Sequence, residues 1–488
     1  MSIPVPKSVL VIGGGPTGLV SLRNMIERGR FERVSLYERR DDVGGVWYFE
    51  DSDKPEDPLH PRWPSPAYKG LIGNVLPSFL SYSEFPFPEP PSTPHQPSPT
   101  LVETHQYLQA FAEPYIKSGA IKLNREVVSV EELGDGKGWK VVARDWTDNG
   151  KEIEELWDAV VIAIGWYDTP YWPETEGLEV LKTHGLAKHA KWWRGPQPYA
   201  GQKVLVVGNA NSSNDIAAQL APVTDGPVYQ SIRRTALYTY PSLPNERIHF
   251  VAPVSKYTLK KTDKGYKFDA LLTDGTTLSD LDSVQIGTGY RLIPNFLRVL
   301  DHSPEAREGA LKPINDETVE PHRIPELHRL ILYARNPSLG FVGAPLAFTP
   351  FTIADIASTW LAFAWLGETP YPDTVERRLI FEQERLEAIE KWRSGFENPS
   401  SLWVFSILGP TEQEYAYNLR KDIVVARPAL DDILPLWNDE RTAVRKAMYQ
   451  KKFEALQYSK NLKDRAANGT AAGSQRGKER MRRYNVYL

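Results

Sequence analysis

Two segments of this chain each join a short apolar strand to a glycine-containing turn and the start of a helix. The first reads VLVIGGGPTG over residues 9–18, and the second reads VLVVGNANSS over residues 204–213. Such a turn brings backbone amides and a helix N-terminus to the pyrophosphate of a dinucleotide. Two of these units in one chain predict two bound dinucleotides and electron transfer between them.

The first motif has every part of the dinucleotide fingerprint. Gly13 makes the tight turn, Gly15 lets the backbone approach the pyrophosphate, and Gly18 lets the helix pack closely. Glu38 follows the next strand, where a carboxylate accepts hydrogen bonds from ribose hydroxyls. The expected contacts of the first dinucleotide in this turn also include Gly14, Pro16 and Thr17.

The second motif departs from that fingerprint at two positions. Ala210 replaces the middle glycine and Ser213 replaces the packing glycine, so a methyl group stands where backbone normally approaches the phosphates. Gly208 retains the turn. The expected contacts at the helix start are Ser212, Ser213, Asn214 and Asp215. After the next strand, Ser231, Arg233 and Arg234 can bind a 2′-phosphate, which favours NADPH over NADH.

Composition excludes several other classes of protein. The chain has 488 residues, enough for about three domains. Its net charge of −4 offers no electrostatic footprint for nucleic acid. Cysteine is absent, which excludes a disulfide framework, a thiolate metal site and the thiol pair of a disulfide reductase. No metal site is expected.

The sequence predicts a cytoplasmic protein without a membrane partner. The first core strand follows Met1 closely and leaves no room for a leader peptide. The longest apolar candidate, Ile353 to Leu366, is shorter than a spanning helix and contains Asp355. We therefore expect it to be a buried helix.

Three further segments resemble the flavin-containing monooxygenases. They are ERRDDVGGVW at 38–47, YKGLIGNV at 68–75 and SEFPFP at 83–88, and the resemblance extends across most of residues 5–367. It implies an FAD cofactor wrapped by Arg39, Gly45, Val46 and Trp47, with Asn74 and Val75 over the flavin. It also assigns cofactor contacts to Val127, Thr288, Gly289 and Tyr290.

The resemblance further implies an α/β fold with two Rossmann-like domains. Residues 1–170 and 281–368 would form a discontinuous FAD-binding domain, with an NADPH-binding domain inserted at 171–280. Residues 369–488 would add a helical extension, with helices at Val375 to Phe396 and Asp439 to Tyr458 and a basic, solvated tail from Lys451 onward.

One pattern between these domains bears on the branch of the family. Monooxygenases of this class carry a glycine and a histidine that match Gly185 and His189, whereas Thr183 and Trp193 depart from the pattern. The stretch is nearer the flavin-containing branch than the Baeyer–Villiger branch. We interpret His189 as a structural histidine satisfied by backbone.

The resemblance implies a reaction in which NADPH reduces FAD, O₂ forms a C4a-hydroperoxyflavin, and a soft nucleophile takes the distal oxygen. The expected substrate is a small amine, hydroxylamine or sulfide. Asn74 is the candidate catalytic residue, because an amide donates to a peroxide oxygen without adding a charge. Three alternatives stay open: a Baeyer–Villiger enzyme acting on a ketone, an uncoupled NADPH oxidase, and a non-catalytic dinucleotide-binding protein. Association into a homo-oligomer also stays open.

Overall fold

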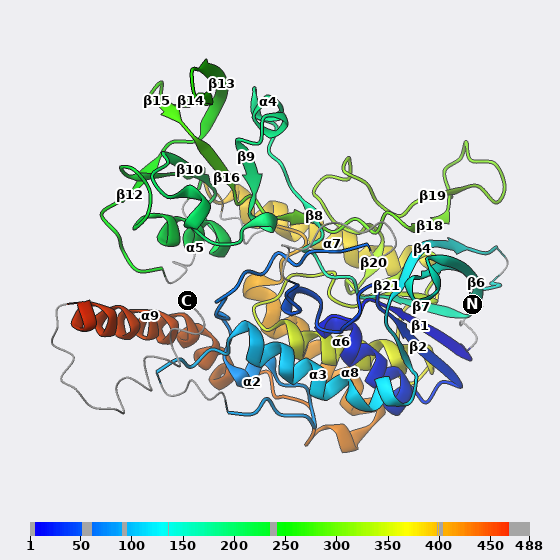
Figure 1. Cartoon of the computed structure of the whole chain (residues 1–488). Coiled ribbons are helices and arrows are strands. Elements are labelled where there is room, and N and C mark those ends of the chain that lie inside the picture. The colour runs from blue at the N-terminus through cyan, green and yellow to red at the C-terminus, as the bar shows by residue number, and fades with distance from the viewer. Residues whose placement is uncertain are drawn as a thin grey trace.

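A computed structural model describes residues 5–50, 61–89, 95–134, 136–234, 242–397, 399 and 404–467. The chain folds into two α/β units and a helical C-terminal part, as the sequence predicts (Figure 1). No helix within these ranges is both long and apolar enough to cross a bilayer.

The first unit is built on a seven-stranded sheet with β1 (Ser8–Ile12) near its middle. β1 pairs in parallel with β2 (Arg33–Tyr37) on one side and β7 (Ala159–Ile162) on the other. β1 and β7 are buried on both faces, which explains their unbroken apolar runs in the sequence. The sheet is completed by β3 (Ile121–Lys122), β20 (Leu327–His328), β21 (Leu332–Tyr333) and β22 (Leu339–Phe341).

Helices cover one face of this sheet and a second sheet packs against the other. The helices are α1 (Pro16–Arg23), continued by a π-helix at Asn24–Gly29, α3 (Leu101–Lys117) and α6 (Pro350–Trp365). The covering sheet contains β4 (Arg125–Glu132), β5 (Trp139–Asp145), β6 (Lys151–Trp157), β18 (Leu297–Leu300) and β19 (Leu311–Pro313). The buried helix expected near Ile353 to Leu366 is confirmed.

The second unit has a smaller, all-parallel sheet centred on β10 (Val204–Val207), which runs into α5 (Asn211–Leu220). The sheet also contains β9 (Ala187–His189), β11 (Val228–Ser231), β12 (Ile248–Val251) and β16 (Ser283–Ile286). An antiparallel sheet of β13 (Val254–Thr262), β14 (Gly265–Leu272) and β15 (Thr277–Leu281) packs beside it, with α4 (Leu178–Thr183).

The sheet topology corrects the expected end of the inserted unit at residue 280. β16 lies beyond that residue, yet it hydrogen-bonds to β10 and β9 of the second sheet. The chain crosses between the units where β8 (Thr169–Pro170) pairs with β17 (Tyr290–Arg291). We therefore propose that the inserted unit ends near this ribbon rather than before β16.

The C-terminal part is helical, as expected, but it is not merely a solvated appendage. It contains α7 (Val375–Ser394), α8 (Glu412–Ala426) and α9 (Asp439–Ala467), and α9 reaches the short α2 (Pro77–Leu80) of the first unit (Figure 1). Lys452 of α9 is buried, which corrects the expectation of a solvated tail from Lys451 onward. Residues 468–488 lie outside the described residues. Short 3₁₀ turns occur at Gly45–Trp47, Trp146–Asp148, Ala190–Trp192, Gln197–Tyr199, Gly409–Thr411 and Pro428–Leu430.

Candidate active site

A cavity of about 630 Å³ opens at the carboxyl ends of β1 and β2. The start of α1 faces it, and no side chain caps this helix at Gly15. Ten residues expected to contact the first dinucleotide line the cavity: Gly13, Gly15, Pro16, Thr17, Glu38, Arg39, Gly45, Val46, Trp47 and Val127. The structure thus brings the first motif, the acidic strand end and the Gly-Val-Trp segment together.

Two glycines of the first motif support the cavity without lining it. The amide of Gly14 donates to Oε2 of Glu38 at 2.5 Å, which ties the turn to the end of β2. A Cβ at Gly18 would lie 1.8 Å from the carbonyl oxygen of Gly13. Gly18 therefore serves the close packing of α1, as its place in the fingerprint predicts.

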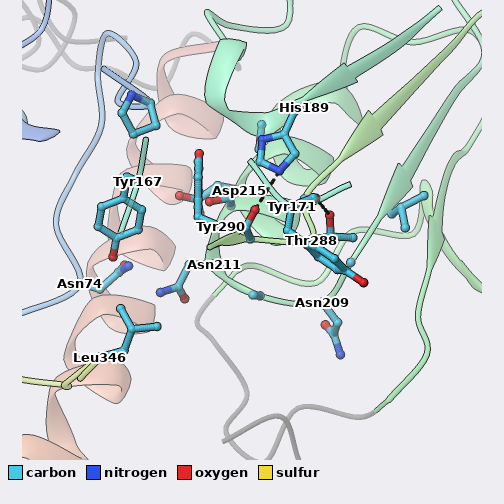
Figure 2. Close-up of a pocket in the computed structure, with 18 of the residues that line it drawn as sticks. Asn74, Tyr167, Tyr171, His189, Asn209, Asn211, Asp215, Thr288, Tyr290 and Leu346 are labelled. Atoms are coloured by element: carbon cyan, nitrogen blue, oxygen red, sulfur yellow. Dashed lines mark hydrogen bonds between the residues drawn. The ribbon is translucent and has the colours of Figure 1, made fainter. Parts of the chain in front are cut away.

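A larger cavity of about 1050 Å³ lies between the two units. Val46, Trp47 and Tyr167 line both cavities, so the two are continuous there. Figure 2 shows Asn74 and Tyr167 facing Asn211 and Thr288 across this space. Eleven expected site residues line it in addition to Val46 and Trp47: Asn74, Val75, Gly208, Ser212, Asp215, Ser231, Arg233, Arg234, Thr288, Gly289 and Tyr290.

Two residues of the second motif depart from their expected place. The hydroxyl of Ser213 is buried and donates to the carbonyl of Gly287 at 3.1 Å. Oδ1 of Asn214 accepts from Gln230 at 2.8 Å. Both side chains are therefore used in packing α5 on its sheet, and neither lines the cavity. Ser212 is the hydroxyl of this helix that faces it.

Two other expected contacts have partners within the protein. Asp215 accepts from the hydroxyl of Tyr68 at 2.9 Å, a bond that joins the second unit to the first. Ser231 donates to the carbonyl of Ala252 at 3.1 Å. The α5 start itself remains uncapped by any side chain at Ala210, so its amides are the groups best placed for a phosphate.

His189 is a structural histidine, as predicted. Its Nε2 lies 3.0 Å from the carbonyl of Gly289, and its Nδ1 accepts from the amide of Lys191 at 3.1 Å. Burial lowers the pKa of His189 to about 4, and the charge of Lys191 acts in the same direction. The imidazole is therefore neutral at pH 7, with its proton on Nε2.

Tyrosines give the cavity neutral hydrogen-bonding walls. Burial raises the pKa of Tyr68, with the carboxylate of Asp215 adding to the effect. Burial likewise raises the pKa of Tyr167 and of Tyr290. These phenols stay protonated and can donate hydrogen bonds, but they do not act as bases near pH 7.

Comparisons with known proteins decide the family. The family model described as flavin-binding monooxygenase-like matches residues 6–237. The flavin-containing monooxygenase FMO GS-OX-like 9 of Arabidopsis thaliana is 30% identical over 383 residues, which are 75% of this chain and 77% of that protein. This chain belongs to the flavin-containing monooxygenase family.

One further relative and one solved structure are similar to a larger share of this monooxygenase. FMO GS-OX-like 2 of Arabidopsis thaliana is 28% identical over 427 residues, covering 84% of this chain and 83% of its own. The solved structure of S-allyl-L-cysteine S-oxygenase from Allium sativum shares the fold, with a TM-score of 0.66 and 22% identity. It covers 92% of this chain and 100% of its own.

The monooxygenase uses FAD and NADPH, and its two cavities fit them. Each cavity is faced by the uncapped N-terminus of a helix, α1 in the first and α5 in the second. Such a terminus suits a pyrophosphate because its backbone amides are unsatisfied and its dipole is positive. Glu38 lines the first cavity, and Arg233 and Arg234 line the second.

Sequence reasoning missed several residues of the site. Tyr68 was inside a quoted motif but was given no role, and Tyr167 follows the β7 strand without a recognisable signal. Nζ of Lys452 donates to Oδ1 of Asn74 across 378 positions. No local pattern in α9 marks that lysine.

Proposed function

We propose that this monooxygenase oxygenates a soft nitrogen or sulfur nucleophile of a small organic molecule. The supporting observation is that Asn74, Tyr167 and Tyr290 line the larger cavity, where the two phenols have raised pKa values and none of the three side chains acts as a base near pH 7. A soft nucleophile reacts with an electrophilic oxygen without first losing a proton. Neutral hydrogen-bond donors are enough to position such a substrate and the reacting oxygen. A substrate that must first lose a proton would need a base in the site.

FAD, when bound, supplies hydride acceptance from NADPH and the activation of O₂. The protein's own groups bind the two dinucleotides, orient the reacting groups and exclude water. The α1 N-terminus and Glu38 hold the first dinucleotide, and Arg233 and Arg234 hold the 2′-phosphate of the second. The amide of Asn74 would donate to the oxygen that is transferred, and Trp47, which lines both cavities, would help to exclude water from the site.

The name of one structural relative supports the sulfur branch of this proposal. The protein from Allium sativum is an S-oxygenase of S-allyl-L-cysteine. Arg291 weighs against the ketone alternative. It lines both cavities, but its guanidinium donates to the carbonyl of Glu317 at 2.7 Å and lies 3.5 Å from the carboxylate of Glu320. That cation is therefore engaged away from Asn74.

A product assay tests the proposal. The holoenzyme is supplied with NADPH, ¹⁸O₂ and, in turn, a sulfide, a tertiary amine and a cyclic ketone. We expect a singly labelled sulfoxide or N-oxide, measured by mass spectrometry. A labelled ester from the ketone as main product would instead establish a Baeyer–Villiger enzyme, and peroxide without any organic product would establish an oxidase.

Replacing Asn74→Ala tests the role of the amide. We expect the product formed per NADPH to fall by about tenfold or more while FAD stays bound, because a donor to the transferred oxygen is lost. Asn211→Ala is a matched control, since it removes an amide from the opposite wall of the same cavity. An Asn74→Ala enzyme with an unchanged product yield would remove Asn74 from the mechanism.

A further inference from the structure

The C-terminal helix α9 is anchored on the segment that carries Asn74. Met448 is fully buried in a cluster with Leu76 and Phe79. One turn or more away, the guanidinium of Arg441 lies 4.5 Å from the ring centre of Phe79, and that of Arg445 lies 4.6 Å from the ring centre of Phe348. These contacts fix the height and rotation of α9 beside the cavity.

At this depth α9 delivers a buried cation to the site. Lys452 is 5% exposed, although a lysine is almost never fully buried without a partner. Its Nζ donates to Oδ1 of Asn74, and the carboxylate of Asp215 also acts on its charge. Burial lowers the pKa of Lys452, and Asp215 opposes that shift. The ammonium thus contacts a residue of the first unit and is attracted by the carboxylate of a residue of the second.

The chemistry of this contact settles which way the amide of Asn74 points. An ammonium has three donors and no acceptor, so it pairs with the carbonyl oxygen of the amide and never with its NH₂ group. With Oδ1 held by Lys452, Nδ2 is directed to the other side, where Asn74 lines the cavity (Figure 2). The cavity therefore meets a hydrogen-bond donor.

We propose that Lys452 is a positioning residue for oxygen transfer: it holds the side-chain amide of Asn74 with Nδ2 facing the cavity. The inference rests on the proposed role of Asn74. Without the ammonium, the amide can rotate and present its carbonyl oxygen instead. An acceptor in that place repels an electron-rich oxygen, whereas a fixed donor stabilises it without reorganisation.

The test compares two neighbouring lysines of α9 in the full-length holoenzyme. Lys452→Met keeps most of the buried stem and removes the donor, while Lys451→Met makes the same change at an exposed position. For Lys452→Met we expect a roughly tenfold fall in product per NADPH, with a matching rise in hydrogen peroxide, since a charged hydrogen bond is lost. Anaerobic reduction of the flavin by NADPH should stay within about twofold. Lys451→Met should change neither quantity.

A double-mutant cycle separates positioning from simple packing. If Lys452 acts through Asn74, then Lys452→Met adds no further loss of coupling to the Asn74→Ala enzyme. Lys452→Arg, which keeps a donor, should recover most of the coupling. Thermal unfolding of each variant shows whether α9 stays docked, because a purely structural role predicts coupling losses that follow the melting temperature and persist in the Asn74→Ala background.

The outcomes distinguish this inference from the proposed function. If Asn74→Ala lowers the product yield but Lys452→Met does not, the positioning role is wrong and the role of Asn74 stands. Additive losses in the double mutant also overturn the positioning role. If Asn74→Ala itself leaves the product yield unchanged, both the catalytic role of Asn74 and the positioning role of Lys452 are wrong.

Discussion

The two dinucleotide units differ in how their first helix packs against the end of the neighbouring strand. In the first, the helix position is Gly18 and the neighbouring strand end is Ala163. In the second, the corresponding pair is Ser213 and Gly287, and the serine hydroxyl donates to the glycine carbonyl. The side chain that fills the space between helix and strand has moved from the strand to the helix.

This exchange explains why the second motif looks degraded in sequence. The hydroxyl of Ser213 fits against β16 because Gly287 has no side chain, and a Cβ there would lie 2.1 Å from Oγ of Ser213. Ala210 is tolerated because its backbone is extended, with φ −115° and ψ −177°, close to the −76° and −178° of Gly15. These backbone angles do not require glycine at either Gly15 or Ala210. The glycine fingerprint is therefore one of at least two residue combinations that let the helix pack closely against the strands of a dinucleotide unit.

The largest expected effect comes from placing alanine at the two equivalent helix positions. A Cβ at Gly18 meets the backbone oxygen of Gly13 at 1.8 Å, so Gly18→Ala should cost more than about 3 kcal/mol in the free energy of unfolding and prevent FAD retention. Ser213→Ala loses one hydrogen bond and should cost about 1 kcal/mol. Denaturant unfolding and the flavin content of the purified protein measure both. Equal losses would show that the two positions are not differently packed.

A swap at the strand end tests the exchange more sharply. A Cβ at Gly287 would lie 2.1 Å from Oγ of Ser213, so Gly287→Ala should cost about 2 kcal/mol and weaken NADPH binding. Adding Ser213→Gly recreates the arrangement of the first unit and should restore most of that loss. The measurement is the coupling energy in a double-mutant cycle. A double variant as unstable as the sum of the single variants would contradict the exchange.

The smallest expected effect is the pH dependence that His189 gives to the free energy of unfolding. In register, His189 of the second sheet corresponds to Phe341 of the first. The pKa of His189 is about 4 when folded, against about 6.5 when unfolded. As pH falls from 7 to 5.5 the unfolded chain takes up a proton that the folded chain does not. The free energy of unfolding should therefore fall by about 1 kcal/mol from this group, and below pH 4 no further loss follows.

His189→Gln, which keeps a donor and an acceptor but does not titrate, should remove that acid sensitivity from the second sheet. Hydrogen exchange at pH 7 and 5.5 follows each sheet separately. His328→Gln is the matched control, because burial also lowers the pKa of His328 to about 4 and this residue lies in β20 of the first sheet. An unchanged exchange profile in the His189→Gln protein would mean that His189 does not carry the effect.

Local sequence predicted most of the fold because each dinucleotide unit begins as strand, turn and helix within a few residues. Both strand, turn and helix starts are confirmed. What sequence could not supply were contacts across long separations. The pairing of Ser213 with Gly287 and of Asn74 with Lys452 depends on how distant segments are brought together. Apolar periodicity and turn chemistry carry no information on such partners.

The β8–β17 ribbon gives the inserted unit an entrance and an exit at the same point. Pro170 pairs with Tyr290, and Thr169 pairs with Arg291, so everything between these strands leaves and returns through neighbouring backbones. Chain ends that lie close together are the condition under which a whole domain can be inserted or removed. We therefore expect that the inserted unit can be exchanged for a related one at these two adjacent points while the first unit keeps its own chain connectivity.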